Sequence, residues 1–429
     1  MLFLKEGKKA VVSLSFLLTA LAVAAMFFTQ FASDLDKRIE KPQPGLEGTG
    51  AYGTINRDDP ELIMPAALSS LFGEFSGNRY TTYPLGFYKP VTLEEKDQEK
   101  MAGILETLTG LSREELLQIT PVDPGVQITF DEDGNQTAVP GYGVPQGLQP
   151  AESLSYGTFL ELMRETDSLL GGGSSYSETS LIDFGADEKT YEEALADYEA
   201  TRQTDGFVGG YARLFSDYLG IPLSFLPAVM AVALCLRDRR AKMQELLWVR
   251  KASSLRLVFS RFLAVVAACM LPVLALAAYS TVCTVSLYPG EALHTGAYFL
   301  YCLGWLLPTV MASAAIGLFF TELTDTPLGI AVMFLYAFIE LNRGMSSMSG
   351  GYGDGLLVPR HNNLQNAAVY AEHFQQLAAN RIVFAAGAVI LVCAAAFLLE
   401  MKRSGKWGGL PALFRRARKH SELPAPQSA

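Results

Sequence analysis

The stretch Leu236–Ala264, LRDRRAKMQELLWVRKASSLRLVFSRFLA, leaves one long apolar run, crosses a basic segment and enters the next apolar run. Between Arg237 and Arg261 it contains eight basic residues and two acidic ones. Basic residues close to membrane spans stay on the cytoplasmic side, so we expect this stretch to face the cytoplasm. Its apolar residues recur at helical spacing and predict a short amphipathic helix. Ser253 and Ser254 predict a break and a cap for the helix that follows.

Six apolar runs approach or exceed the roughly 20 residues that a helix needs to cross a bilayer. They cover residues 10–32, 216–236, 262–287, 296–320, 326–341 and 381–400. The fifth run has 16 residues, so it needs a thin region of the bilayer or the help of flanking residues. The sequence therefore predicts a polytopic α-helical membrane protein with six transmembrane helices.

Charge is distributed very unevenly along the chain. Residues 32–217 carry 33 acidic and 13 basic residues, whereas the rest of the chain carries 11 acidic and 21 basic residues. An acidic block outside the cell and basic loops inside it are typical of membrane topology rather than of nucleic-acid binding. With both termini in the cytoplasm, the basic clusters at 5–9, 237–261 and 402–419 all fall on the cytoplasmic side.

These patterns divide the chain into four parts. Residues 1–32 form a cytoplasmic start and the first transmembrane helix, and residues 33–215 form an extracellular domain. Residues 216–401 form a membrane domain of five further transmembrane helices, and residues 402–429 form a basic cytoplasmic tail. A cleaved signal peptide is the alternative for the first run, but the run is longer than a usual signal core.

Within residues 33–215 the local signals predict a mixed α/β domain in which helices dominate. Capping-box patterns at Thr92–Glu95 and Ser112–Glu115 each predict the start of a helix. Residues Gln127–Phe130 are typical of a strand that leads into a turn. A helix over Phe159–Leu170 is expected to end at the glycines Gly171–Gly173.

The membrane domain carries two further local signals. Ser313 and Gly317 form a small-residue face in the fourth span, which favours close helix packing. Residues Glu340–Ala379 are expected to form a second external segment, with a flexible Gly-rich portion at Ser347–Gly355. Its later part, Asn363–Ala379, predicts a helix that leans on the membrane surface.

Known catalytic and nucleotide-binding motifs are absent from the sequence. No GxxxxGK[ST] occurs, so the chain has no P-loop of its own, and HExxH and GxSxG are also missing. All five cysteines fall in predicted spans and the four histidines are scattered, so we predict no metal, cofactor or catalytic residues. Glu322, Glu340 and Glu400 lie at span ends, which leaves the spans almost free of interior charge. Ion-coupled carriers usually need such charge, so energy is expected to come from another source.

The order of the spans, the segment RDRRAKMQELLWVRKASS followed by Ser260–Ala264, and the approach to the last span at Asn380 resemble the permease subunit of ABC exporters of the type-2 class. In that family the charged segment forms a cytoplasmic coupling helix, here 237–256. A large external domain between the first two spans is similar to bacterial permeases that extrude sodium or confer antibiotic resistance.

The resemblance implies that the coupling helix inserts into a groove of a separate ABC ATPase subunit, which binds ATP and magnesium. The residues implied to contact it are Met243, Glu245, Leu246, Leu247, Trp248 and Arg250. A second copy of the permease, or a related permease, would complete the membrane path in the plasma membrane. The alternative for this segment is an ordinary amphipathic loop that rests on lipid headgroups.

The leading functional hypothesis is therefore a transport subunit without catalytic activity of its own, which exports a substrate with energy from the ATPase. The second hypothesis is a membrane-anchored sensor or cell-envelope assembly factor that uses the external domain. A membrane enzyme is the third, since no catalytic constellation is visible. The sequence does not identify a substrate.

Overall fold

The computed structural model describes residues 2–84, 88–119, 126–130, 136–140, 148–240, 253–289, 293–345, 352, 355–359, 364 and 367–406. The chain forms two compact units. The helical unit combines Met1–Glu40 with Asp197–Ala429, and the second unit is Lys41–Ala196. The second unit is shorter at both ends than the predicted domain 33–215, since residues 33–40 and 197–215 belong to the helical unit. Residues 206–215 form the start of a long helix of that unit.

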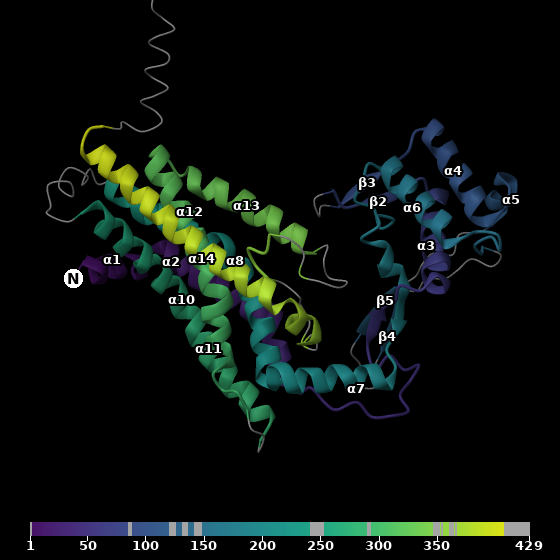
Figure 1. The fold of residues 1–429 in the computed structure, drawn as a ribbon, viewed down its shortest axis with the longest axis horizontal. Helices are drawn as coiled ribbons and strands as arrows, with labels where there is room; N and C mark the ends of the chain where they lie inside the picture. The colour runs from purple at the N-terminus through teal and green to yellow at the C-terminus, as the bar shows by residue number, and fades with distance from the viewer. Residues whose placement is uncertain are drawn as a thin grey trace, which may run out of the picture. The chain divides into compact units, whose positions relative to one another are not determined.

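The helical unit begins with α1 and ends with the long helix α14 (Figure 1). Its elements are α1 (Leu2–Val11), α2 (Leu14–Met26), the π-helix η1 (Phe27–Phe31), the 3-10 helix η2 (Ala32–Asp36), the π-helix η5 (Thr201–Asp205), α8 (Gly206–Arg240), α10 (Ser254–Leu287), α11 (Ala297–Tyr301), the π-helix η6 (Cys302–Leu306), α12 (Leu307–Thr324), α13 (Leu328–Met345) and α14 (Ala367–Arg403).

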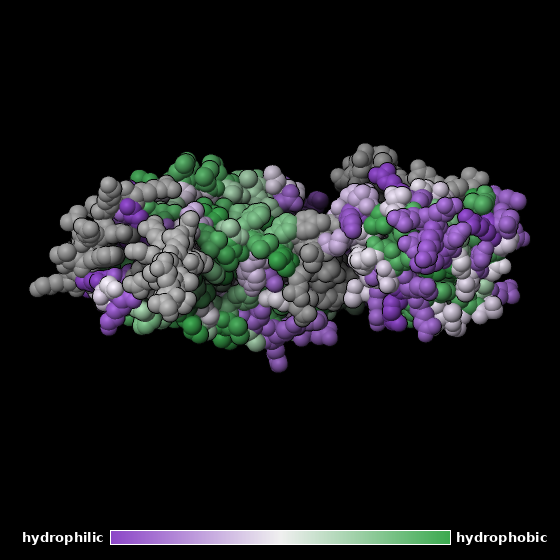
Figure 2. Space-filling view, turned by 90° about the horizontal axis from the view of Figure 1, so that it is seen from above, coloured by the Kyte–Doolittle hydropathy of each residue, from purple (hydrophilic) through white to green (hydrophobic). Residues whose placement is uncertain are grey.

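Apolar residues occupy both the core and much of the outside of this unit. Helices α8, α10, α12 and α14 pack on one another (Figure 1), and a continuous cluster of buried side chains joins them. Large apolar side chains are exposed as well, among them Val282, Ile390 and Phe397, and apolar residues spread over the visible face of the unit (Figure 2). A helix that is apolar all round is typical of a membrane span.

Five helical stretches within the described residues are long and apolar enough to cross a membrane. They are Leu14–Asp36, Gly206–Arg239, Ser254–Leu287, Ala297–Thr324 and Ala367–Arg403. The predicted fifth span corresponds to α13, whose apolar part Leu328–Leu341 is shorter. The structure is thus consistent with a polytopic helical membrane protein. By length and composition, five described helical stretches qualify as spans, whereas the sequence predicts six.

The predicted surface helix at Asn363–Ala379 does not form a separate element. Its described part from Ala367 onward is continuous with the last span in α14, which runs to Arg403 without a break. No proline or glycine interrupts the junction around Asn380, so the helical backbone continues from one segment into the other.

The predicted small-residue face brings helices α8 and α12 unusually close together. A Cβ atom on Gly317 would lie 2.8 Å from the Cα and carbonyl oxygen of Ala228. The Ser313 hydroxyl accepts a hydrogen bond from the Ala228 N–H at 3.2 Å. A Cβ on Gly329 of α13 would in turn lie 2.8 Å from the Gly317 carbonyl oxygen. The prediction of close packing at Ser313 and Gly317 is confirmed, and it involves three helices.

The second unit is built from short helices and three two-stranded antiparallel sheets, and polar residues cover most of its visible face (Figure 2). Its elements are β1 (Thr54–Asn56), α3 (Pro60–Ser76), β2 (Tyr80–Thr82), β3 (Lys89–Val91), α4 (Glu95–Thr109), α5 (Arg113–Gln118), β4 (Val126–Phe130), β5 (Gln136–Pro140), α6 (Tyr156–Leu170), the 3-10 helix η4 (Leu181–Gly185), β6 (Ala186–Glu188) and α7 (Tyr191–Ala200), which crosses into the helical unit at Asp197.

Most local signals in this unit are confirmed. Ser112 and Glu115 form the complete capping box of α5, and α6 ends at Gly171, whose positive φ of 91° suits glycine. The predicted strand is β4, which pairs with β5. The capping box at Thr92 is wrong: α4 starts at Glu95 with Glu94 as its N-cap and without a side-chain cap.

Arg57 joins the β1–β6 sheet to the start of α7. Its guanidinium donates to both carboxylate oxygens of Glu193, at 2.7 and 2.8 Å, and to Asp187 at 2.8 Å. Its backbone N–H donates to the Gly185 carbonyl at 2.8 Å. A Cβ on Gly185 would lie 2.0 Å from the Arg57 carbonyl oxygen, so only glycine fits there. The paired Arg57 lowers the pKa of Glu193 to about 2.

Loss of this ion pair is expected to loosen the β1–β6 sheet in a pH-dependent way. Because the pKa of Glu193 is lowered in the folded state, its stabilisation is present above the ordinary pKa near 4.5 and is lost as the pH falls toward 2. At pH 6, Arg57→Gln should reduce the hydrogen-exchange protection of β1 and β6 about fivefold in the full-length protein.

The matched control is Arg164→Gln, which removes an exposed ion pair with Glu178 at 3.4 Å and should leave the protection unchanged. In the unsubstituted protein, protection corrected for the intrinsic exchange rate should fall between pH 4.5 and pH 2. Equal exchange of the Arg57 and Arg164 variants at pH 6 would contradict the assignment.

Candidate functional site

The basic segment leaves α8 and enters α10 at a group of buried ion pairs, which we name the α1 cluster: Glu6, Lys9, Asp238 and Arg261. Arg261 pairs with Asp238, and its Nε lies 3.7 Å from Oε2 of Glu6. Lys9 Nζ donates to Glu6 at 2.9 Å and to Asp238 at 3.4 Å. Glu6 is 2% and Arg261 5% exposed. Two acids and two bases make the cluster neutral, which a buried site requires.

A second group, the α12 cluster, joins α8 to α12 and α14. Arg239 donates to Glu322 Oε2 at 2.7 Å and to the Thr321 carbonyl at 3.1 Å, and it also pairs with Asp325. Lys402 Nζ lies 2.8 Å from Asp325 Oδ1. Asp325 ends α12 in a left-handed conformation, with a φ of 60°. The charges of Arg239, Glu322, Asp325 and Lys402 sum to zero, as in the α1 cluster.

The start of α10 is held in the same region. Ser253 is its N-cap, and the Ser253 side chain accepts the Arg256 N–H at 3.3 Å, which confirms the predicted cap. The Ser254 hydroxyl donates to the Glu400 carboxylate near the end of α14. Both ends of the basic segment are therefore anchored, to α1 and α12 on the α8 side and to α1 and α14 on the α10 side.

Several of these residues escaped sequence reasoning. The sequence marked Arg239 and Arg261 only as basic residues of the segment, whereas the structure places both in ion pairs, with Arg261 buried and Arg239 largely so. Two signals pointed to them: Asp238 is an acid inside a basic segment, and the 321–326 turn carries acidic residues but no basic residue.

The six residues predicted to contact an ATPase, namely Met243, Glu245, Leu246, Leu247, Trp248 and Arg250, lie outside the described residues. The structure describes the chain up to Arg240 and again from Ser253. The described residues therefore include the two ends of the basic segment but not the six predicted contacts.

Buried charges also lie near the starts of α8 and α14, where they leave the span interiors nearly free of charge, as predicted. Arg213 and Asp217 of α8 are 2% and 3% exposed, and Arg381 of α14 is 4% exposed. Both helices are longer than the predicted runs, and at 1.5 Å per residue the 21 residues from Arg381 to Lys402 span about 32 Å, close to the thickness of a hydrocarbon core. The charges of α14 therefore flank the apolar stretch at its two ends.

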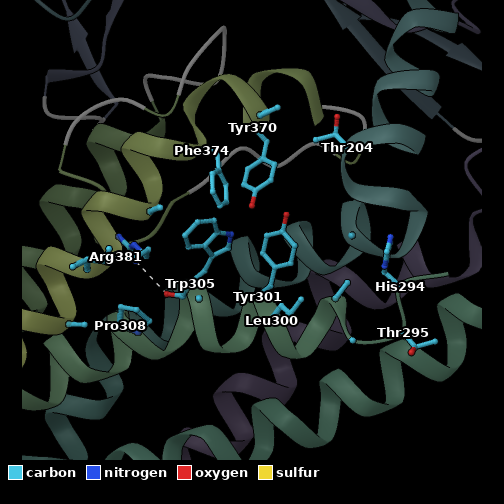
Figure 3. A pocket seen from close by; sticks show the side chains of 18 of the residues that line it. Thr204, His294, Thr295, Leu300, Tyr301, Trp305, Pro308, Tyr370, Phe374 and Arg381 are labelled. Atoms are coloured by element: carbon cyan, nitrogen blue, oxygen red, sulfur yellow. Dashed lines mark hydrogen bonds between the residues drawn. The ribbon is translucent and has the colours of Figure 1, made fainter.

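At the end opposite to the ion-pair clusters, the helical unit contains a cavity of about 1150 Å³ (Figure 3). Tyr301 and Trp305 from the start of the fourth span face Tyr370 and Phe374 of α14, and the two tyrosine hydroxyls point toward each other (Figure 3). The full lining is Thr204, Gly209, Leu293, His294, Thr295, Gly296, Ala297, Leu300, Tyr301, Gly304, Trp305, Pro308, Tyr370, Ala371, Phe374, Ala378, Arg381, Ile382 and Ala385.

Arg381 closes one end of this cavity and clamps an inserted loop. Its guanidinium donates to Thr309 Oγ1 at 3.0 Å and to the carbonyls of Leu357 at 3.2 Å and Trp305 at 3.4 Å. It also donates to the Leu356 carbonyl. Leu357 is fully buried. The described residues after the Gly-rich portion of the predicted external segment are therefore packed among the helices.

Among the described residues, no group of three or more His, Cys, Asp or Glu side chains could hold a metal ion. Four acidic residues at the helix ends, Glu6, Asp238, Glu322 and Asp325, are instead engaged in the ion pairs above.

Comparison with known proteins gives one match. Residues 173–352, less than half of the chain, match the family described as ABC-2 family transporter protein. No curated protein and no solved structure matches the chain. The matched segment includes α8, α10, α12 and α13, and hence the base of the basic segment. Together with the apolar helices, the match supports identifying the chain as a multi-pass membrane permease of an ABC transporter.

Proposed function

We propose that this chain is the membrane-spanning subunit of an ABC exporter and that a separate ATPase drives it through the basic segment. The observation that carries this proposal is the pair of buried ion-pair clusters at the base of that segment. An ABC-2 permease implies an ABC ATPase partner in general. Export as the direction rests on the resemblance to type-2 exporters.

The clusters support a topology with both termini in the cytoplasm. Ion pairs join α1 and the ends of α8, α12 and α14 to one another, so these ends lie on one side of the bilayer. That side carries the basic segments and is therefore the cytoplasmic one. In this topology the unit Lys41–Ala196, which follows the first span, lies outside the cell.

The same contacts favour α13 as the sixth span. Asp325 after α12 and Lys402 at the end of α14 form an ion pair, so both lie on the same side of the bilayer. The chain between them must therefore cross the bilayer twice. In this proposal α13 crosses the bilayer in the first direction and α14 crosses it back. The apolar part of α13 is short, and neighbouring residues or a thinner bilayer would accommodate it.

The clusters also suggest how the ATPase would move the helices. The basic segment is tied at Asp238 and Arg239 to α1 and α12, and at Ser254 and Arg261 to α14 and α1. A displacement of the segment would thus be transmitted to three helices at once, α1, α12 and α14. In this proposal the paired charges exchange partners within each cluster as the segment moves.

The docking site itself is proposed at Met243, Glu245, Leu246, Leu247, Trp248 and Arg250. The test is copurification of the ATPase subunit with the full-length permease from membranes. The double charge reversal Glu245→Lys with Arg250→Glu should reduce the recovered ATPase about tenfold, because oppositely charged contacts would become repulsive. Membrane insertion should not change.

The matched control is Arg256→Glu, since Arg256 is an exposed residue of the same basic stretch on α10 outside the proposed contact. Its ATPase recovery should stay close to that of the unsubstituted protein. If the double variant also retains its ATPase, the docking site is elsewhere. Recovery of a kinase or a peptidase in place of an ATPase would favour the sensor hypothesis.

A further inference from the structure

We propose that the aromatic cavity of the helical unit binds an anionic amphiphile, that is, a molecule with a negatively charged headgroup and an apolar body, of the phospholipid type. The inference rests on the proposed function and adds to that function the class of molecule that the exporter would take. Four properties of the cavity carry it: its level in the membrane, its polarity, its charge and its opening.

The cavity lies at the outer membrane–water boundary of the proposed topology. Its lining residues on the fourth span come from the start of that span, far from Glu322, and those on α14 are far from Lys402. Arg381, in the cavity wall, is separated from Lys402 by about one hydrocarbon thickness. Tyr and Trp side chains such as Trp305 are typical of this level of the bilayer.

The lining combines a polar end, an aromatic middle and an end that contains Arg381. Thr204, His294 and Thr295 lie at one end, and the four aromatic rings lie between them and the part formed by Pro308 and Arg381 (Figure 3). Ile382 and Ala385, the lining residues closest to the bilayer centre along α14, are apolar. A ligand whose anionic head lies at the Arg381 end and whose apolar body runs along the rings and Ile382 matches this lining. A uniformly polar ligand would leave its polar groups unpaired.

The charge of the cavity wall favours an anionic ligand over a cationic one. None of the described lining residues is acidic, whereas Arg381 is cationic. In the described part of the chain, the hydrogen bonds of Arg381 go to neutral oxygens only, namely main-chain carbonyls, the Thr309 hydroxyl and the Asn380 amide. The positive charge is therefore not cancelled by a bonded carboxylate and attracts an anion across the low-dielectric interior.

The cavity is open toward the lipid. Leu300 and Ile382 line it and are 71% and 69% exposed, and both belong to candidate spans. Its volume of about 1150 Å³ exceeds the roughly 300–1,000 Å³ of most small-molecule sites. A long apolar body could thus enter sideways from the bilayer while its headgroup stays at the boundary.

The glycines of the helical unit offer a way to fill the cavity without disturbing the helices. Gly304 lines the cavity, and a Cβ there meets no atom within 4 Å. Gly387 on α14 has the same free space but does not line the cavity. Gly304→Leu and Gly387→Leu are therefore a matched pair, one that blocks the site and one that does not.

The test uses the fluorescence of Trp305 in the full-length protein, with Trp248→Phe and Trp407→Phe introduced so that Trp305 is the remaining tryptophan. The protein is reconstituted into phosphatidylcholine vesicles with increasing fractions of phosphatidylglycerol brominated on its chains, or of equally brominated phosphatidylcholine. Bromine quenches tryptophan on contact. We expect half-quenching at about a fivefold lower fraction of the anionic lipid.

Gly304→Leu should abolish this preference, and Gly387→Leu should keep it. A second pair tests the charge: Ala371→Glu places an acid in the lining, and Gln375→Glu places one on an exposed position outside it. Only Ala371→Glu should remove the preference for the anionic lipid.

Equal half-quenching by the two lipids in the unsubstituted protein would overturn the proposal, since it would indicate ordinary boundary lipid. Absence of quenching by either lipid would also overturn it and would indicate that another protein surface, such as a second copy, covers the cavity. The assay contains no ATPase. If the lipid preference is absent but the ATPase still copurifies, the cavity proposal alone is rejected. If the lipid preference is present but no ATPase copurifies, the proposed function alone is rejected.

Discussion

Replacing Arg261 with Met is expected to lower the free energy of unfolding of the helical unit by about 3–5 kcal/mol. Arg261 is 5% exposed and lies between two acids, Asp238 and Glu6, of which Glu6 is 2% exposed. Removal of the guanidinium would leave two buried carboxylates with only Lys9 to balance them. The measurement is the thermal unfolding of the purified full-length protein in detergent.

Two further variants make this expectation specific. Arg256→Met removes an exposed base from the same helix and should change the stability by less than about 0.5 kcal/mol. Adding Asp238→Asn to Arg261→Met removes one of the orphaned carboxylates and should restore much of the loss. If the Arg256 and Arg261 variants unfold at the same temperature, Arg261 is not a buried partner of these acids.

The second large effect is expected at Gly317, where α12 touches α8. A Cβ there would lie 2.8 Å from two backbone atoms of Ala228, closer than real contacts allow, and backbone atoms cannot rotate away. Gly317→Leu should therefore force α8 and α12 apart and destabilise the unit by about 3 kcal/mol or more. It should also break the hydrogen bond from Ala228 to Ser313.

The comparison for this experiment is Gly387→Leu, since a Cβ on Gly387 meets no atom within 4 Å. That variant should keep its melting temperature and its yield from membranes. Gly317→Ala should fall between the two, because a single methyl group already meets the α8 backbone. Unfolding of the Gly317→Leu protein at the same temperature as the Gly387→Leu protein would show that the helices are not in close contact.

Arg261 and Gly317 lie in two different parts of the helical unit. Arg261 and its partners fasten the basic segment to the helix ends, and Gly317 lets α8, α12 and α13 pack closely next to it. In the proposed exporter, an ATPase would act on the first part and the second would carry the movement toward the cavity. The Arg261 variant therefore bears on coupling and the Gly317 variant on helix packing.

Sequence alone determined those features that depend on neighbours along the chain. Apolar runs of sufficient length predict spans, because length and composition along the chain decide them. The serines at 112 and 253 predict helix starts and Gly171 predicts a helix end, because capping acts within one helical turn. The small residues Ser313 and Gly317 also indicated a close contact, although not its partner.

The tertiary structure alone decided which distant residues meet. Arg239 pairs with Glu322 across 83 positions and Lys402 with Asp325 across 77, and such pairs follow from how the helices pack rather than from spacing. The signals at Asp238 and at the 321–326 turn did not name the partners of these residues. The cavity arises in the same way, because its four rings come from two helices that only packing places face to face.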